Sequence, residues 1–174
     1  MNKTNSIILI GMPGVGKSTL GILLAKETAK DFVDTDVLIQ LKESTTLQEI
    51  INKKGHETLR HIEEAVLLET SFPNHIVATG GSAVYSDAGM KRLKTFGNVI
   101  FLDLDLESLK KRIHNYETRG IAKKPDQTFD ELFNERKILY QKYADITINC
   151  FNKTVEETLK EICSALEIHF STLK

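Results

Sequence analysis

The residues best able to do chemistry lie near the start of the chain, from Gly11 to Ser18. They read Gly-Met-Pro-Gly-Val-Gly-Lys-Ser, a full match to the pattern G-x-x-x-x-G-K-[ST], and an apolar run over residues 7–10 precedes them. In this pattern backbone N–H groups face the phosphates of a nucleoside triphosphate, the lysine reaches the β- and γ-phosphates, and the hydroxyl ligates Mg²⁺. The residues predicted to bind ATP here are Gly14, Val15, Gly16, Lys17, Ser18 and Thr19. The alternative is an ordinary glycine-rich turn, which the strand before the segment and the helix after it disfavour.

A pair of carboxylates, Asp34 and Asp36, follows at the end of the second apolar run. Residues two apart in extended backbone point the same way, so both carboxylates project at the carboxyl edge of a parallel sheet, where ligands bind in open α/β folds. One of them can hold Mg²⁺ through water, and the other can accept a proton from an attacking hydroxyl. The alternative is that one of them only caps the helix that follows.

Two weaker signals come next along the chain. Arg60 lies on a predicted helix, with Glu63 and Glu64 three and four residues further on. The apolar face of that helix consists of Leu59, Ile62 and Val66. Glutamates at this spacing either orient the guanidinium toward a bound anion or form an ordinary surface ion pair. The pair Gly80 and Gly81 either exposes backbone N–H groups to a ligand or makes a turn. Spacing alone leaves both questions open.

Short apolar runs that alternate with helical periods predict the elements that position these residues. The fold class is α/β, with a five-stranded parallel sheet sandwiched by helices. The predicted strands are Ser6–Ile10, Asp31–Asp34, His75–Thr79, Val99–Leu102 and Ile146–Asn149. The predicted helices are Lys17–Ala29, Thr46–Lys53, Glu57–Thr70, Asp87–Lys94, Leu106–Asn115, Phe129–Lys142 and Val155–His169, the last beginning at a capping box formed by Thr154 and Glu157.

One segment, about residues 114–127, lacks any periodicity and contains lysines, a glycine and a proline. A loop of this length inside a compact domain is unusual, so we expect a mobile lid there. The 174 residues are expected to form a single domain, residues 1–174.

Composition excludes several classes of function. A formal net charge of −1 argues against a broad contact surface for nucleic acid or anionic membrane. No apolar segment is long enough for a signal peptide or a membrane span. Cys150 and Cys163 lack the C-x-x-C spacing and fit buried, reduced thiols, so we expect a cytoplasmic protein. The five histidines show no zinc-ligand spacing.

Taken in order, these motifs resemble those of the shikimate kinases, a family of P-loop kinases related to nucleoside-monophosphate kinases. The resemblance includes the phosphate loop, Asp-Thr-Asp-Val at 34–37, Gly-His-Glu-Thr-Leu-Arg at 55–60, Thr-Gly-Gly at 79–81, Arg119 in the lid and Glu-Arg-Lys-Ile-Leu-Tyr at 135–140. It implies phosphorylation of the 3-hydroxyl of shikimate, a step of aromatic amino-acid biosynthesis, with ATP and Mg²⁺.

The same resemblance implies a role for each residue. The acceptor would be bound by Asp36, Arg60, Gly80, Gly81 and Arg136. The metal would be held at Ser18 and Asp34, and catalysis would depend on Lys17, Asp36 and Arg119. The nucleotide would also contact Arg112, Arg119 and the loop 149–154. Three residues have simpler alternatives: Arg136 as one more charge on its helix, Arg119 as a solvated loop residue, and Arg112 as part of a basic helix end.

The chain differs from the family pattern at three places, all on the acceptor or lid side. Ser82 stands where the family usually has a third glycine, Gly-Ile-Ala follows Arg119 where Pro-Leu is usual, and Leu59 stands where an aromatic residue is usual. The nucleotide side is unchanged.

Three other functions compete with this one. The first is a kinase for another small polyol or hydroxy acid on the same scaffold. The second is a GTPase switch, disfavoured because no D-x-x-G or Asn-Lys-x-Asp motif follows the phosphate loop. The third is a non-catalytic nucleotide-binding domain, which would be expected to lack Lys17 or Asp36. The expected partners are ATP and a small shikimate-like hydroxy acid, with no nucleic acid or membrane, and the expected state is a monomer.

Overall fold

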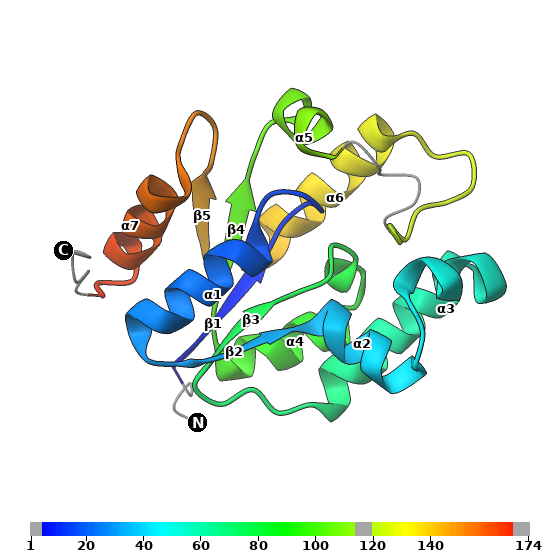
Figure 1. Ribbon diagram of the computed structural model, residues 1–174, viewed down its shortest axis with the longest axis horizontal. Coiled ribbons are helices and arrows are strands. Elements are labelled where there is room, and N and C mark those ends of the chain that lie inside the picture. The colour runs from blue at the N-terminus through cyan, green and yellow to red at the C-terminus, as the bar shows by residue number, and fades with distance from the viewer. Residues whose placement is uncertain (1–4, 114–119, 169–174) are drawn as a thin grey trace.

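A sheet of five parallel strands lies at the centre of the computed structural model, which describes residues 5–113 and 120–168 (Figure 1). The strand order is β2-β3-β1-β4-β5. The strands are β1 (Ser6–Ile10), β2 (Asp31–Asp34), β3 (His75–Ala78), β4 (Gly97–Asp103) and β5 (Ile146–Asn149). In the central strand, Ile8 lies opposite Val77 of β3 and Val99 of β4, and every residue of β1 is buried. This is the pattern of a parallel sheet covered on both faces, and it confirms the predicted fold class.

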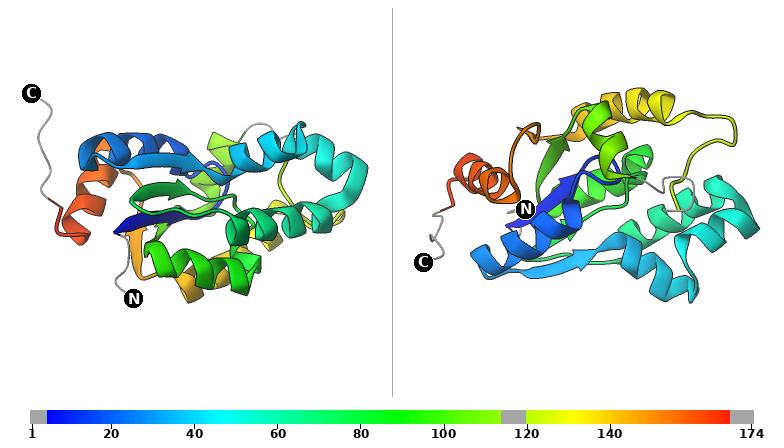
Figure 2. Two further views of the ribbon diagram at one scale, coloured as in Figure 1. Left: turned by 90° about the horizontal axis from the view of Figure 1, so that it is seen from below. Right: turned by 45° about the horizontal axis from the view of Figure 1, so that its top comes forward.

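Helices cover both faces of the sheet. They are α1 (Lys17–Thr28), α2 (Thr35–Glu43), α3 (Leu47–Glu69), α4 (Asp87–Phe96), α5 (Leu106–Arg112), α6 (Phe129–Tyr143) and α7 (Val155–Ala165), with a short 3₁₀ helix η1 (Ala83–Tyr85). Helices α1 and α7 lie on one face, and α4 and α6 on the other (Figure 2). Helices α2 and α3 extend beyond the sheet, where they surround a small apolar cluster of Ile39, Ile50, Leu59, Val66 and Ala122.

The structure corrects the predicted helices in three ways. The two helices expected at 46–53 and 57–70 join into α3, with a break at Gly55, whose φ of 82° and ψ of 165° are not helical. The sequence patterns do not predict α2, because it begins at the end of β2 without any intervening turn residue. Three helices end earlier than expected, since α1 ends at Thr28, α5 at Arg112 and α7 at Ala165.

Local capping explains why several helices begin where they do. The predicted capping box at Thr154 and Glu157 is present, and Thr46 with Glu49 and Thr128 with Glu131 form two more. None of the helices in the described ranges is long and apolar enough to cross a membrane.

The described part of the predicted lid, residues 120–127, contains no helix or strand. Gly120 N–H donates to Oε1 of Gln48 at 2.8 Å, which fixes the segment to α3. Ile121 and Ala122 are buried on this side. Arg119 and the rest of the expected lid, residues 114–119, lie outside the described residues.

Candidate active site

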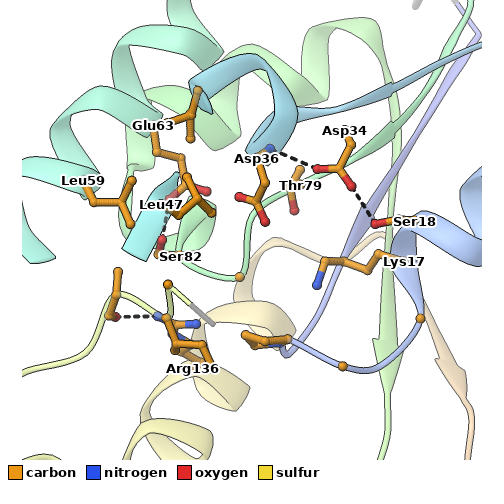
Figure 3. A pocket seen from close by; sticks show the side chains of 18 of the residues that line it. Lys17, Ser18, Asp34, Asp36, Leu47, Leu59, Glu63, Thr79, Ser82 and Arg136 are labelled. Atoms are coloured by element: carbon orange, nitrogen blue, oxygen red, sulfur yellow. Dashed lines mark hydrogen bonds between the residues drawn. The ribbon is translucent and has the colours of Figure 1, made fainter. Parts of the chain in front are cut away.

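A cavity of about 280 Å³ opens where β1, β2 and β3 end (Figure 3). Its position is the carboxyl edge of a parallel sheet, as expected for an open α/β fold. The lining residues come from the phosphate loop, the start of α2, one face of α3, the turn after β3, the segment 120–122, and α6. Most residues predicted from the sequence therefore lie around one space.

The phosphate loop forms one wall of the cavity and begins α1. Gly16 has a φ of 108° at the helix N-terminus, a conformation that favours glycine. Lys17, only 9% exposed, donates from Nζ to the carbonyl oxygens of Gly11 at 2.8 Å and Met12 at 3.1 Å. The predicted ATP-binding residues that line the cavity are Gly14, Gly16, Lys17, Ser18, Thr19 and Arg112.

A second, smaller cavity of about 180 Å³ adjoins the loop on the side of α7. The buried side chain of Val15 lines it, together with Cys150 and Lys153 of the loop expected to face the adenine. Arg112 donates from Nη1 to the carbonyl of Val15 at 3.3 Å, so its side chain packs on the phosphate loop and is more than part of a basic helix end. Burial raises the pKa of the Cys150 thiol to about 11, which keeps it neutral.

Ser18 and Asp34 are in direct contact. The Ser18 hydroxyl donates to Oδ2 of Asp34 at 2.5 Å, while Oδ1 accepts from the backbone N–H of Asp36 at 3.0 Å. Asp34 is therefore the N-cap of α2 as well as the partner of Ser18. A hydroxyl and a carboxylate side by side are the hard oxygen ligands that Mg²⁺ prefers. Within residues 5–113 and 120–168, no cluster of three or more His, Cys, Asp or Glu side chains suits a metal.

Asp36 is not the helix cap, so the capping alternative is wrong for this residue. It lies in the first turn of α2 and points into the cavity (Figure 3). The neighbouring Thr35 accepts a hydrogen bond at 2.8 Å from the backbone N–H of Gly80, which fixes α2 against the turn after β3. A Cβ atom at position 80 would clash with carboxylate oxygens of Glu63 and Asp36. The two carboxylates therefore approach the backbone of Gly80 closely, and a side chain at this position would have to displace them.

Glu63 is a site residue for which the sequence suggests only a partner role to Arg60. It is 2% exposed, and its Oε2 accepts from the Ser82 hydroxyl at 2.5 Å, while Oε1 is buried with no hydrogen bond. Burial, and next the nearby charge of Asp36, raise the pKa of Glu63 to about 7. The available signal is its place on the apolar face of α3, between Leu59 and Val66. A glutamate on that face is costly unless it is protonated, paired or hydrogen-bonded, so its presence there points to a site.

Arg136 is the most deeply buried charge of the site. It is 1% exposed, and its Nη2 donates to the carbonyl of Ala122 at 2.7 Å. Among the residues that the structure describes, no carboxylate lies within ion-pair distance of its guanidinium. The alternative of an ordinary surface charge on α6 is wrong. A buried guanidinium without an ion pair is costly, and an anionic ligand would neutralise it.

Arg60 approaches the same carbonyl but does not line the cavity. Its Nη2 is 3.5 Å from the oxygen of Ala122, and the side chain lines a neighbouring groove between α3 and η1. It forms no ion pair with Glu63 or Glu64, which instead accept hydrogen bonds from Ser82 and Ser86. The surface ion pair considered from the spacing is therefore wrong, and Arg60 and Arg136 converge on one oxygen atom.

All three differences from the family pattern also lie here. Leu59 and Ser82 line the cavity, and so do Gly120, Ile121 and Ala122, the three residues that follow Arg119. The part of the cavity where the sequence analysis places the acceptor is therefore lined by these differing residues.

The parallel sheet, the phosphate loop and a cavity that combines a lysine with carboxylates define a P-loop kinase. Comparison with known proteins gives the family. The family model for shikimate kinase matches residues 13–167. The chain belongs to the shikimate kinase family, and it is an ATP-dependent phosphotransferase that acts on an alcohol.

The relatives match over nearly their full length. A shikimate kinase of Sulfurihydrogenibium sp. is 34% identical over 93% of this chain and 98% of its own. A shikimate kinase of Staphylococcus haemolyticus is 35% identical over 95% of this chain and 97% of its own. Among solved structures, a shikimate kinase from Acinetobacter baumannii in complex with shikimate has a TM-score of 0.83 and 30% identity, covering 98% of this chain and 96% of that one.

Proposed function

We propose that this protein transfers the γ-phosphoryl group of ATP to the 3-hydroxyl of shikimate, with Mg²⁺ as the bound metal. The family membership supports the reaction, and the related shikimate kinase from Acinetobacter baumannii forms a complex with shikimate. The observation in this chain that supports a carboxylate-bearing acceptor is Arg136, a buried guanidinium that has no described carboxylate within ion-pair distance. An acceptor with a carboxylate would neutralise it.

On the donor side, the backbone of the phosphate loop and Lys17 hold the phosphates. Lys17 brings positive charge to the oxygen that bridges the β- and γ-phosphates, where negative charge develops as the bond to the leaving group breaks. Ser18 and Asp34 fit Mg²⁺, which when bound neutralises phosphate charge. Arg119 is the proposed partner of the transferred group.

On the acceptor side, Asp36 accepts the proton of the reacting hydroxyl as that oxygen attacks the γ-phosphorus. Its position supports this role, because it faces Lys17 across the cavity (Figure 3). Arg136 and Arg60 bind the carboxylate of the acceptor, and the planar fork of each guanidinium suits two parallel hydrogen bonds. Gly81 lines the cavity beside Nη1 of Arg136, and we assign it to the acceptor site together with the neighbouring Gly80, whose N–H donates to Thr35.

The test is a product assay by mass spectrometry with purified protein, ATP, Mg²⁺ and shikimate, beside a panel of other hydroxy acids and polyols. We expect phosphoshikimate as the main product. Shikimate methyl ester separates the roles of the two ends of the acceptor, because it keeps the 3-hydroxyl but removes the charge that Arg136 binds. The ester should react with a much higher KM. Efficient phosphorylation of a different hydroxy acid, with no phosphoshikimate, would show that the acceptor assignment is wrong.

A further inference from the structure

Tyr85 is the one aromatic ring that contacts both acceptor arginines in the described structure. It ends η1, directly after the Gly-Gly-Ser turn, and is half-buried. The guanidinium carbon of Arg60 lies 3.6 Å above the centre of its ring, and that of Arg136 lies 5.5 Å from the same centre. The ring is thus a shared platform for two residues that come from different helices, α3 and α6.

The far end of the ring is fixed as well. The Tyr85 hydroxyl donates to Oε1 of Glu135 at 2.5 Å, and Oε2 of Glu135 accepts from the side-chain amide of Gln127 at 2.7 Å. The hydrogen bond from Tyr85 is the main reason that the pKa of Glu135 is lowered, so this carboxylate stays ionised and holds the hydroxyl in place. Tyr85 therefore has little freedom to turn away from Arg60.

The way in which the ring holds Arg60 matters for binding. At 3.6 Å the guanidinium must lie nearly parallel to the ring, because a perpendicular one would bring a nitrogen into van der Waals overlap with it. A stacked guanidinium uses its face and keeps the N–H donors of its edge available in their plane. Those edge donors are the ones that bind a carboxylate in a bidentate way.

The ring also holds the arginine without neutralising it. A carboxylate in the same place would pair with the guanidinium and compete with the acceptor, whereas a π-face attracts a cation and offers no competing anion. The edges of both arginines already converge, since the Nη2 atoms of Arg60 and Arg136 lie 3.5 Å and 2.7 Å from one carbonyl oxygen, that of Ala122.

From this geometry we infer that Tyr85 is a positioning residue for the acceptor: it holds the guanidiniums of Arg60 and Arg136 so that their edges receive the carboxylate of the substrate. The inference rests on the proposed function for the identity of that substrate. It gives the turn after β3 a second role, in addition to the close contact of the Gly80 backbone with the carboxylates of Glu63 and Asp36.

The first experiment compares Tyr85→Leu, which removes the ring, with Tyr85→Phe, which keeps the ring and removes the hydroxyl that bonds to Glu135. In steady-state kinetics we expect Tyr85→Leu to raise the KM for shikimate about tenfold, with kcat and the KM for ATP within about twofold of the parent. Tyr85→Phe should raise the KM for shikimate about twofold. Phe96→Leu is the matched control, since it removes a ring that lies 4.9 Å below Arg92 outside the cavity. It should leave the KM for shikimate unchanged.

The second experiment does not depend on the acceptor. Phenylglyoxal modifies accessible guanidiniums, and peptide mass spectrometry gives the rate for each arginine. Because the ring covers one face of Arg60, we expect its modification to be several times faster in Tyr85→Leu than in the parent and in Tyr85→Phe, with Arg92 unchanged.

Each outcome decides the assignment. An unchanged KM for shikimate in Tyr85→Leu, or an equal loss in kcat, would overturn it. If the parent does not phosphorylate shikimate, the proposed function is wrong. The modification rates then test the positioning role of Tyr85 on their own. A faster rate at Arg60 in Tyr85→Leu supports the positioning role, and an unchanged rate overturns it.

Discussion

The effect of Glu63 on the pH dependence of stability can be worked out quantitatively from its surroundings. The residue is 2% exposed, and burial together with the charge of Asp36 raises the pKa of its carboxyl group from 4.5 to about 7. The hydrogen bond from Ser82 and the charges of Arg136 and Lys17 act in the opposite direction and do not compensate. Replacing Glu63 by glutamine keeps the size and an oxygen that accepts from Ser82, and it removes the ability to ionise.

The sign follows from proton linkage. A carboxyl whose pKa is higher in the folded state binds its proton more tightly there than in the unfolded chain, so its contribution favours folding at low pH. That contribution is lost as the pH rises from 4.5 through 7. Each pKa unit corresponds to about 1.4 kcal/mol, so ionisation of Glu63 costs about 3 kcal/mol of stability above pH 8. The variant Glu63→Gln should be nearly as stable as the parent at pH 4.5 and about 3 kcal/mol more stable at pH 8.5.

The assay is urea denaturation at several pH values between 4.5 and 8.5, followed by circular dichroism, with the free energy of unfolding taken by linear extrapolation. Glu57→Gln is the matched control, because Glu57 is an exposed glutamate of the same helix. Its curve should follow that of the parent within about 0.5 kcal/mol. The reasoning is refuted if the difference in free energy of unfolding between Glu63→Gln and the parent does not grow with pH. It is also refuted if Glu57→Gln shows the same growth.

Three predictions concern catalysis. Arg119→Ala should lower kcat at least about a hundredfold and leave the KM for the acceptor nearly unchanged, the pattern of a contact made mainly in the transition state. A rise in KM alone would contradict that role. Arg60→Ala should weaken binding of shikimate by about 2 kcal/mol, as for a lost charge-assisted hydrogen bond, measured by isothermal titration calorimetry. An affinity equal to that of the parent would remove Arg60 from the acceptor site. Ser18→Ala should raise the Mg²⁺ concentration needed for half-maximal activity, and an unchanged Mg²⁺ dependence would rule out this hydroxyl as a ligand.

How much the sequence predicts depends on how local the signal is. The phosphate loop and the β-strands follow from short contiguous patterns, and the structure confirms the strands to within about two residues at their ends. Helix α2 has no such pattern, because its start signal, Asp34, is also the end of β2. Tyr85, which the sequence reasoning missed, and the contact of Ser82 with Glu63 become significant only when α3 and α6 are brought against the turn after β3. No hydrophobic periodicity in the sequence indicates how these two helices pack against that turn.

The hydrogen bonds to the carbonyl oxygen of Ala122 affect which sequence changes can alter acceptor affinity in this enzyme. It is a main-chain atom, so no side-chain substitution removes it, and it takes hydrogen bonds from the same two guanidiniums that we propose for the acceptor. The position of residues 120–122 and the affinity for a carboxylate are therefore thermodynamically linked, since each draws on the same donors. Insertions, deletions or glycine substitutions that move this segment will change acceptor affinity without altering any residue that contacts the acceptor through its side chain. A screen for altered acceptor preference should thus include the length of this loop as well as the residues of the cavity.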